Sequence, residues 1–165
     1  MMRHVPWIGL AALGVIGVGW RSWLQRRRYG SSGIFVFRSR DTGQRVRDAV
    51  VPLLIAVVVI QAMAYSLWPY TIAMKMLVRP FNVLGTVAIA GGIALLARAQ
   101  LDLGASWRIG IEKGASPGVV TTGLYRWTRN PIFTAMCVAL GGVTLLIPTW
   151  VSLATFAGCL MGVWL

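Results

Sequence analysis

The chain has few charged residues and very few residues that could act as acids, bases or metal ligands. Only 12% of its 165 residues are charged, four of them are acidic, and His4 is the single histidine. One histidine cannot supply a zinc site or a Ser-His-Asp triad. Soluble domains carry about 25% charged residues. This chain therefore has too few polar side chains for a water-facing surface, and most hydrolase chemistry is excluded.

Cysteine is also scarce. Cys137 and Cys159 both lie inside apolar segments, without the spacing of metal ligands or of a disulfide framework. We interpret both as buried free thiols, and we expect no metal site.

The chain is rich instead in long apolar runs, with 57% hydrophobic residues and a mean hydropathy of +0.71. A membrane-spanning helix needs about 20 mostly apolar residues. The runs predict an all-α fold, a polytopic transmembrane helical bundle that forms a single integral membrane domain over residues 1–165. The predicted helices cover residues 5–24, 49–70, 81–97, 131–149 and 151–165. The first run has no cleavage site of a signal peptide, so we expect it to be retained.

Small residues and prolines predict details of this bundle. Pro52 is expected in the first turn of the second helix, where proline is tolerated. Gly85, Ala88 and Gly92 recur at a spacing that lets helices approach closely in lipid. The last two runs adjoin at Pro148, which predicts a C-terminal helical hairpin. The fifth run is short and no charge closes it, so we expect a further C-terminal segment to be missing.

The basic residues predict the orientation of the chain. The net charge is +12, with eight arginines in residues 21–48 and five basic residues in residues 98–130. Lys and Arg gather in cytoplasmic loops, so both stretches are predicted to be cytoplasmic loops, with the N-terminus outside a bacterial inner membrane. Apolar spans separate the basic residues. We therefore expect membrane lipid as the partner, and not nucleic acid.

The most informative stretch covers residues 103–135, which are dense in Gly, Thr, Tyr, Trp and Arg. It leads directly into the apolar run that begins at Pro131. Proline is favoured at the first position of a helix, and the N–H groups at a helix start can hold a carboxylate. Arg126 and Arg129 add positive charge beside that helix start.

Two motifs in this stretch carry a resemblance to a known family. Gly-Leu-Tyr at residues 123–125, followed by Arg-Asn-Pro-Ile-Phe at residues 129–133, resembles the Gly-x-Tyr…Arg-His/Asn-Pro-x-Tyr signature. That signature belongs to the isoprenylcysteine carboxyl methyltransferase-like integral membrane methyltransferases, within the phospholipid methyltransferase superfamily. The resemblance covers roughly residues 98–150. It implies methyl transfer from S-adenosylmethionine to a lipid-like acceptor that enters from the bilayer.

The resemblance also implies the residues that bind S-adenosylmethionine. Carried over by position, they lie on both sides of the Gly-x-Tyr motif: Pro117, Gly118, Val119, Val120, Tyr125, Asn130, Pro131, Ile132 and Phe133. Arg129 could hold the methionine carboxylate or could be a membrane-boundary arginine, and no other catalytic residue is assigned. Phe133 replaces the usual Tyr of the signature. The family's C-terminal Glu-Glu segment has no counterpart in residues 1–165.

Three functions stay open at this point. Methylation of a carboxylate, as in isoprenylcysteine carboxyl O-methylation, needs alignment and dehydration of the nucleophile but little acid–base chemistry. Phospholipid N-methylation needs a base, for which Asp102 and Glu112 are the nearby acids. A non-catalytic membrane relative is the third reading. The sequence leaves the methyl acceptor and the oligomeric state open.

Overall fold

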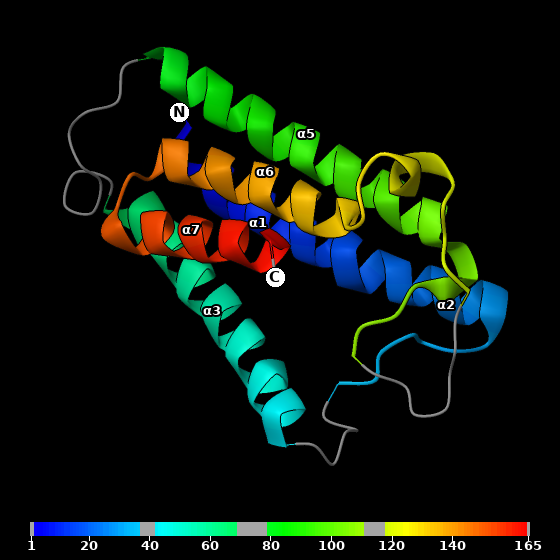
Figure 1. Cartoon of the computed structure of the whole chain (residues 1–165). Coiled ribbons are helices and arrows are strands. Elements are labelled where there is room, and N and C mark those ends of the chain that lie inside the picture. Colours follow the sequence, from blue (N-terminus) through cyan, green and yellow to red (C-terminus); the bar gives the residue numbers. More distant parts are fainter. Residues whose placement is uncertain (1, 37–41, 69–78, 111–117, 165) are drawn as a thin grey trace.

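The computed structural model describes residues 2–36, 42–68, 79–110 and 118–164. Those residues form an all-helical fold with no strand, which confirms the predicted all-α class (Figure 1). The main helical elements are α1 (Val5–Gly14), the π-helical segment η2 (Val15–Trp20), α2 (Arg21–Tyr29), α3 (Thr42–Leu67), α5 (Arg79–Leu103), α6 (Pro131–Leu146) and α7 (Trp150–Trp164). The described residues also form three short 3-10 segments, namely η1 (Met2–His4), η3 (Gly104–Ser106) and η4 (Gly123–Arg126).

The helices extend beyond the apolar runs, so the first predicted loop is too long. The first helix continues without a break to Tyr29, and α3 begins at Thr42. Residues 21–29 and 42–48 are therefore helical rather than loop. Arginine is a good helix former, and the first helix ends only at Gly30, which adopts a left-handed conformation with φ 73°.

The second predicted loop and the position of Pro52 need the same correction. The helix α5 runs to Leu103, so residues 98–103 are helical. Pro52 lies in the interior of α3, not in its first turn, because α3 starts at Thr42. A proline there cannot donate a backbone hydrogen bond and crowds the carbonyl of the preceding turn.

Two helices of the described residues are long and apolar enough to cross a membrane. They span Val5–Tyr29 and Pro80–Ser106. Only 11% and 22% of the residues in their most apolar windows are buried inside the molecule, so most residues of these windows keep exposed surface. Shorter apolar helices cover Ile55–Leu67, Pro131–Leu146 and Trp150–Met161.

Glycines bring α5 and α6 into the most extensive helix contact of the described fold. A Cβ added at Gly92 would lie 2.8 Å from the backbone nitrogen of Ala139, and one at Gly85 would lie 2.9 Å from the carbonyl oxygen of Gly142. This confirms the prediction that Gly85 and Gly92 serve close helix packing. The adjoining apolar core consists of Val58, Ala62, Ile89, Val143, Leu146 and Ile147.

A buried arginine joins α2 to the C-terminal end of α5. Arg21 is only 1% exposed. Its Nε donates to the carbonyl of Gln100 at 3.2 Å, Nη2 donates to the carbonyl of Gly104, and the guanidinium lies 5.0 Å from the centre of the Trp107 ring. The last carbonyls of a helix lack partners within the helix and carry partial negative charge. Arg21 therefore supplies hydrogen-bond donors to carbonyls at the end of α5 and offsets their partial negative charge.

Two buried glutamines extend this connection along both helices. The amide nitrogen of Gln25 donates to the carbonyl of Ala105 at 3.0 Å, and that of Gln100 donates to the carbonyl of Gly17 at 2.7 Å. Both side chains are buried. The N-terminal helix is thus held to α5 at several points by polar side chains.

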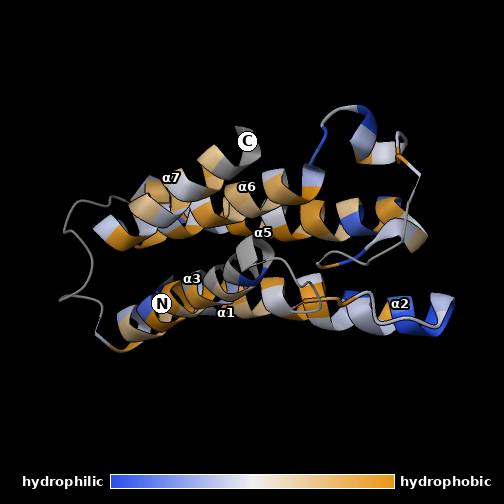
Figure 2. Ribbon diagram, turned by 60° about the horizontal axis from the view of Figure 1, so that its bottom comes forward, coloured by the Kyte–Doolittle hydropathy of each residue, from blue (hydrophilic) through white to orange (hydrophobic). Residues whose placement is uncertain are grey.

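The segments that follow α2 and α5 are also paired. The N–H of Phe35 donates to the carbonyl of Ile109 at 2.7 Å, and the N–H of Ile109 donates to the carbonyl of Gly33 at 2.8 Å. Gly33 has φ 69° and packs against the Trp107 ring. Figure 2 shows that hydrophilic residues gather at this end of the molecule, on α2 and on the turn η4.

Replacement of Arg21 by methionine should lower the free energy of unfolding by about 2–4 kcal/mol, because buried carbonyls lose a charged donor. Chemical unfolding in detergent micelles measures this. The matched control is Arg26→Met on the same helix, where the side chain is exposed and the expected change is within about 0.5 kcal/mol. Equal losses in both variants would contradict the role of Arg21.

Candidate functional site

The predicted cofactor residues lie before, within and after the turn η4, up to the first turn of α6. Pro117 falls outside the described residues. Gly118 and Val119 are exposed and Val120 is half-buried. The other predicted residues belong to η4 or to the start of α6. The end of α5 lies beside this turn, as in Figure 1.

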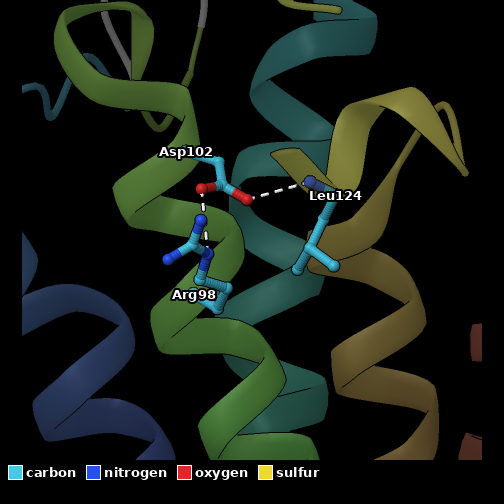
Figure 3. Close-up of polar contacts among 3 residues, drawn as sticks. All are labelled: Arg98, Asp102 and Leu124. Carbon is cyan, nitrogen blue, oxygen red and sulfur yellow. Dashed lines mark hydrogen bonds and ion pairs between the residues drawn. The ribbon is translucent and has the colours of Figure 1, made fainter. Parts of the chain in front are cut away.

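The carboxylate of Asp102 holds η4 against the last turn of α5 (Figure 3). It accepts a hydrogen bond from the backbone N–H of Leu124 at 2.9 Å and pairs with Nε of Arg98 at 3.0 Å. The Asp102 side chain is 8% exposed, whereas that of Arg98 is 65% exposed. The anchoring role of Asp102 was not predicted. The only sequence signal for it is the i, i+4 pairing with Arg98 at a helix end.

Gly123 is required by the close approach of this carboxylate. It adopts a left-handed conformation with φ +60°, and a Cβ there would collide with the carboxylate of Asp102. Residues other than glycine rarely adopt that left-handed backbone conformation. The glycine of the Gly-x-Tyr motif thus has a definite structural role in this chain.

Tyr125 is half-buried behind this anchor. Burial raises the pKa of its phenol above the ordinary value of 10.0, and the negative charge of Asp102 raises it further. The hydroxyl therefore stays protonated at neutral pH and can donate a hydrogen bond to an acceptor in the site.

The helix α6 begins at Pro131, as the sequence predicts. Asn130 caps it, because its Oδ1 accepts from the N–H of Phe133 at 3.4 Å. The N–H of Thr134 donates to the carbonyl of Asn130 at 3.1 Å, and Pro131 is fully buried. The Thr134 bond is the first bond within the helix, whereas the N–H groups of Phe133 and of Asn130 itself are taken by Asn130 Oδ1 and by the hydroxyl of Thr128, the latter at 3.4 Å. Proline has no N–H, so this helix start offers fewer N–H groups to a carboxylate than the sequence suggests.

The outer side of the site is open and carries aromatic and basic groups. Val119 is 89% exposed and Trp127 is 80% exposed. The guanidinium of Arg126 lies 5.5 Å from the centre of the Trp127 ring. Arg129 is exposed next to the capped start of α6. Ile132 is half-buried there.

The site therefore consists of an anchored turn and a capped helix start. Within the described ranges, no group of three His, Cys, Asp or Glu side chains could hold a metal ion. Family models, curated proteins and solved structures give no match to this chain.

Replacement of Gly123 by alanine should lower the free energy of unfolding by about 1–3 kcal/mol, because the left-handed backbone and the Asp102 carboxylate both oppose a Cβ. Chemical unfolding measures the loss. Gly118→Ala is the matched control in the same stretch, since nothing lies within 4 Å of a Cβ there. A Gly123→Ala protein as stable as the control would refute the close contact.

The pKa of Tyr125 should lie above the ordinary value of 10.0. Ultraviolet titration, with Tyr125→Phe subtracted, isolates this phenol. In Asp102→Asn the pKa should fall but stay above its ordinary value, because burial is the larger cause. The raised pKa contributes to the free energy of unfolding. This contribution is complete below the pKa of the unfolded state and is lost as the pH rises through the pKa of the folded state. An unchanged Tyr125 pKa in Asp102→Asn would show that the two groups do not interact.

Proposed function

We propose that this chain is an S-adenosylmethionine-dependent membrane methyltransferase that acts on a carboxylate of a lipid-like acceptor. The observation that carries the proposal is the anchored turn η4, held by Asp102 beside the capped start of α6. The Gly-x-Tyr and Arg-Asn-Pro-x-Phe motifs thus adjoin the polar end of apolar helices. A polar cofactor and an apolar acceptor could meet at such a boundary.

The proposal includes a polytopic arrangement in a bacterial inner membrane, with a C-terminal helical hairpin and the basic end in the cytoplasm. Two long apolar helices with largely unburied surfaces support it, because a core helix of a soluble protein would be mostly buried. Arg21 and Gln100 bind the first helix into the fold. That contact argues against a cleaved signal peptide.

The fit of S-adenosylmethionine rests on the donors at this site. Arg129 is exposed beside the start of α6 and would pair with the methionine carboxylate. The protonated hydroxyl of Tyr125 would donate to a polar group of the cofactor. The exposed Val119 and Phe133 would cover apolar parts of it. When bound, the cofactor supplies a sulfonium methyl group as the electrophile.

The chain's own contribution is positioning and exclusion of water. The rigid turn, fixed by Asp102 and Gly123, would hold the two reactants in line. The turn would present the methyl group that the cofactor supplies to a carboxylate oxygen of the acceptor. The exposed apolar side chains of Val119, Trp127 and Phe133 would lie against a lipid-like acceptor and displace water from its carboxylate, which would raise the reactivity of that carboxylate.

The structure of the site favours O-methylation over N-methylation. An amine acceptor must lose a proton to a base. Of the two acids that could serve as this base, the structure describes only Asp102, which is largely buried and already engaged by Arg98 and by the N–H of Leu124. Glu112 lies outside the described residues, and the choice of acceptor does not rest on it. A carboxylate needs no such base. We therefore propose the carboxylate as acceptor.

Isothermal titration of the purified full chain in micelles with S-adenosylhomocysteine tests cofactor binding. Arg129→Gln should weaken binding by about tenfold to a hundredfold, because a charge-assisted hydrogen bond is lost. Arg26→Gln is the matched control, since it removes an exposed positive charge on α2, and it should leave binding within about twofold. The absence of binding in the intact chain would favour a non-catalytic membrane relative.

The acceptor class is tested separately with radiolabelled cofactor and two acceptors, a prenylated cysteine with a free carboxylate and an ethanolamine phospholipid. A methyl ester releases its label as methanol in base, whereas an N-methyl group keeps it. Base-labile product from the prenylated cysteine alone is expected. Base-stable label on the phospholipid would overturn the choice of acceptor but not the binding of the cofactor.

A further inference from the structure

The two cysteines of the chain lie against one another across the contact between α6 and α7. Sγ of Cys137 is 2.7 Å from Sγ of Cys159, although 22 positions separate them in the sequence. Both are free thiols. The sequence predicts buried thiols but contains no spacing signal for this pairing, since it arises only when α7 packs on α6.

The surroundings of the pair hold the two helices in register. The hydroxyl of Thr144 on α6 shares its proton between the carbonyl of Leu140 at 2.9 Å and that of Ser152 on α7 at 3.2 Å. A Cβ added at Gly141 would lie 3.2 Å from the ring of Phe156. These contacts position α6 and α7 next to the cysteines. Only a small movement is therefore needed to bring the two sulfurs to the disulfide bond distance of about 2.05 Å.

We propose that Cys137 and Cys159 form a reversible redox site, in which a small-molecule disulfide converts the dithiol into a disulfide that links α6 to α7. This inference does not rest on methyltransferase activity. Its geometric basis is the contact of the two sulfurs, and its chemical basis is thiol–disulfide exchange.

The two thiols have different roles in the reaction because their exposure differs. Cys137 is buried at 7% exposure and Cys159 is half-buried. Cys159, after loss of its proton, attacks the reagent, forms a mixed disulfide and releases one small thiol. Cys137 then loses its proton and attacks Sγ of Cys159, which forms the protein disulfide and releases the second small thiol. The two protein thiols lose two electrons in total, and the reagent disulfide gains them.

Treatment of the folded full chain with dithiodipyridine tests this order, because each exchange releases thiopyridone, which absorbs light. The wild-type chain should release two equivalents, keep no pyridyl adduct and lose the mass of two hydrogen atoms. A reductant should restore the original mass. Peptide mapping without reduction should recover one linked pair that contains Cys137 and Cys159.

Serine variants provide matched controls, since serine is close in size to cysteine. Cys137→Ser should release one equivalent and keep the pyridyl adduct on Cys159, because the resolving thiol is absent. Cys159→Ser should react roughly tenfold more slowly, since exposure governs access to the remaining thiol. Far-ultraviolet circular dichroism verifies that both variants stay helical.

Two outcomes would overturn the proposal. One is a wild-type chain that retains two pyridyl adducts, which would mean that the thiols react independently. The other is a linked peptide found only between separate chains. Retention of the intramolecular link in a chain that fails to bind S-adenosylhomocysteine would leave the redox site standing and remove only the proposed function.

Discussion

The hydrogen bonds from Arg21 to the end of α5 are the interaction on which the rest of the structure depends. The guanidinium of Arg21, a residue that is 1% exposed, neutralises the partial negative charge at the C-terminal end of that helix. Asp102 lies in the same last turn, where an acidic residue is ordinarily unfavourable. The ion pair with Arg98 offsets that cost directly, and Arg21 lowers it by neutralising carbonyls at the same helix end. Asp102 is thereby available to anchor η4.

The anchored turn in turn fixes the start of α6. The carboxylate of Asp102 accepts a hydrogen bond from the N–H of Leu124. Asn130, which follows shortly after Leu124 in the chain, caps α6. Farther along, Gly85 and Gly92 let α6 lie directly on α5. The two ends of α6 are therefore set by independent contacts with one partner helix. A ligand site between η4 and α6 would inherit this rigidity, which the alignment of reactants requires.

The sequence predicted the features that depend on local chemistry. The start of α6 follows from Asn130-Pro131, and the glycine contacts follow from the spacing in α5. The helix ends are predicted less well. Charged stretches beside apolar runs predict loops, although arginine favours helix, and the helices continue into these stretches. The burial of Arg21 and the anchor at Asp102 join positions far apart in the chain. No local pattern distinguishes Arg21 from a solvated loop charge, and the i, i+4 spacing to Arg98 is the single local signal for Asp102.

Beside its apolar core, the fold buries several polar side chains and exposes large apolar ones. Arg21, Gln25 and Gln100 lie inside, whereas Leu53 and Ile60 on α3 are each 64% exposed. In water this arrangement would lose hydrophobic stabilisation and bury costly polar groups. In lipid the hydrophobic effect no longer drives helices together, and close packing at small residues and interhelical hydrogen bonds hold them instead. The contacts of α5 are of these two kinds, which is the physical reason for proposing a bilayer around this fold.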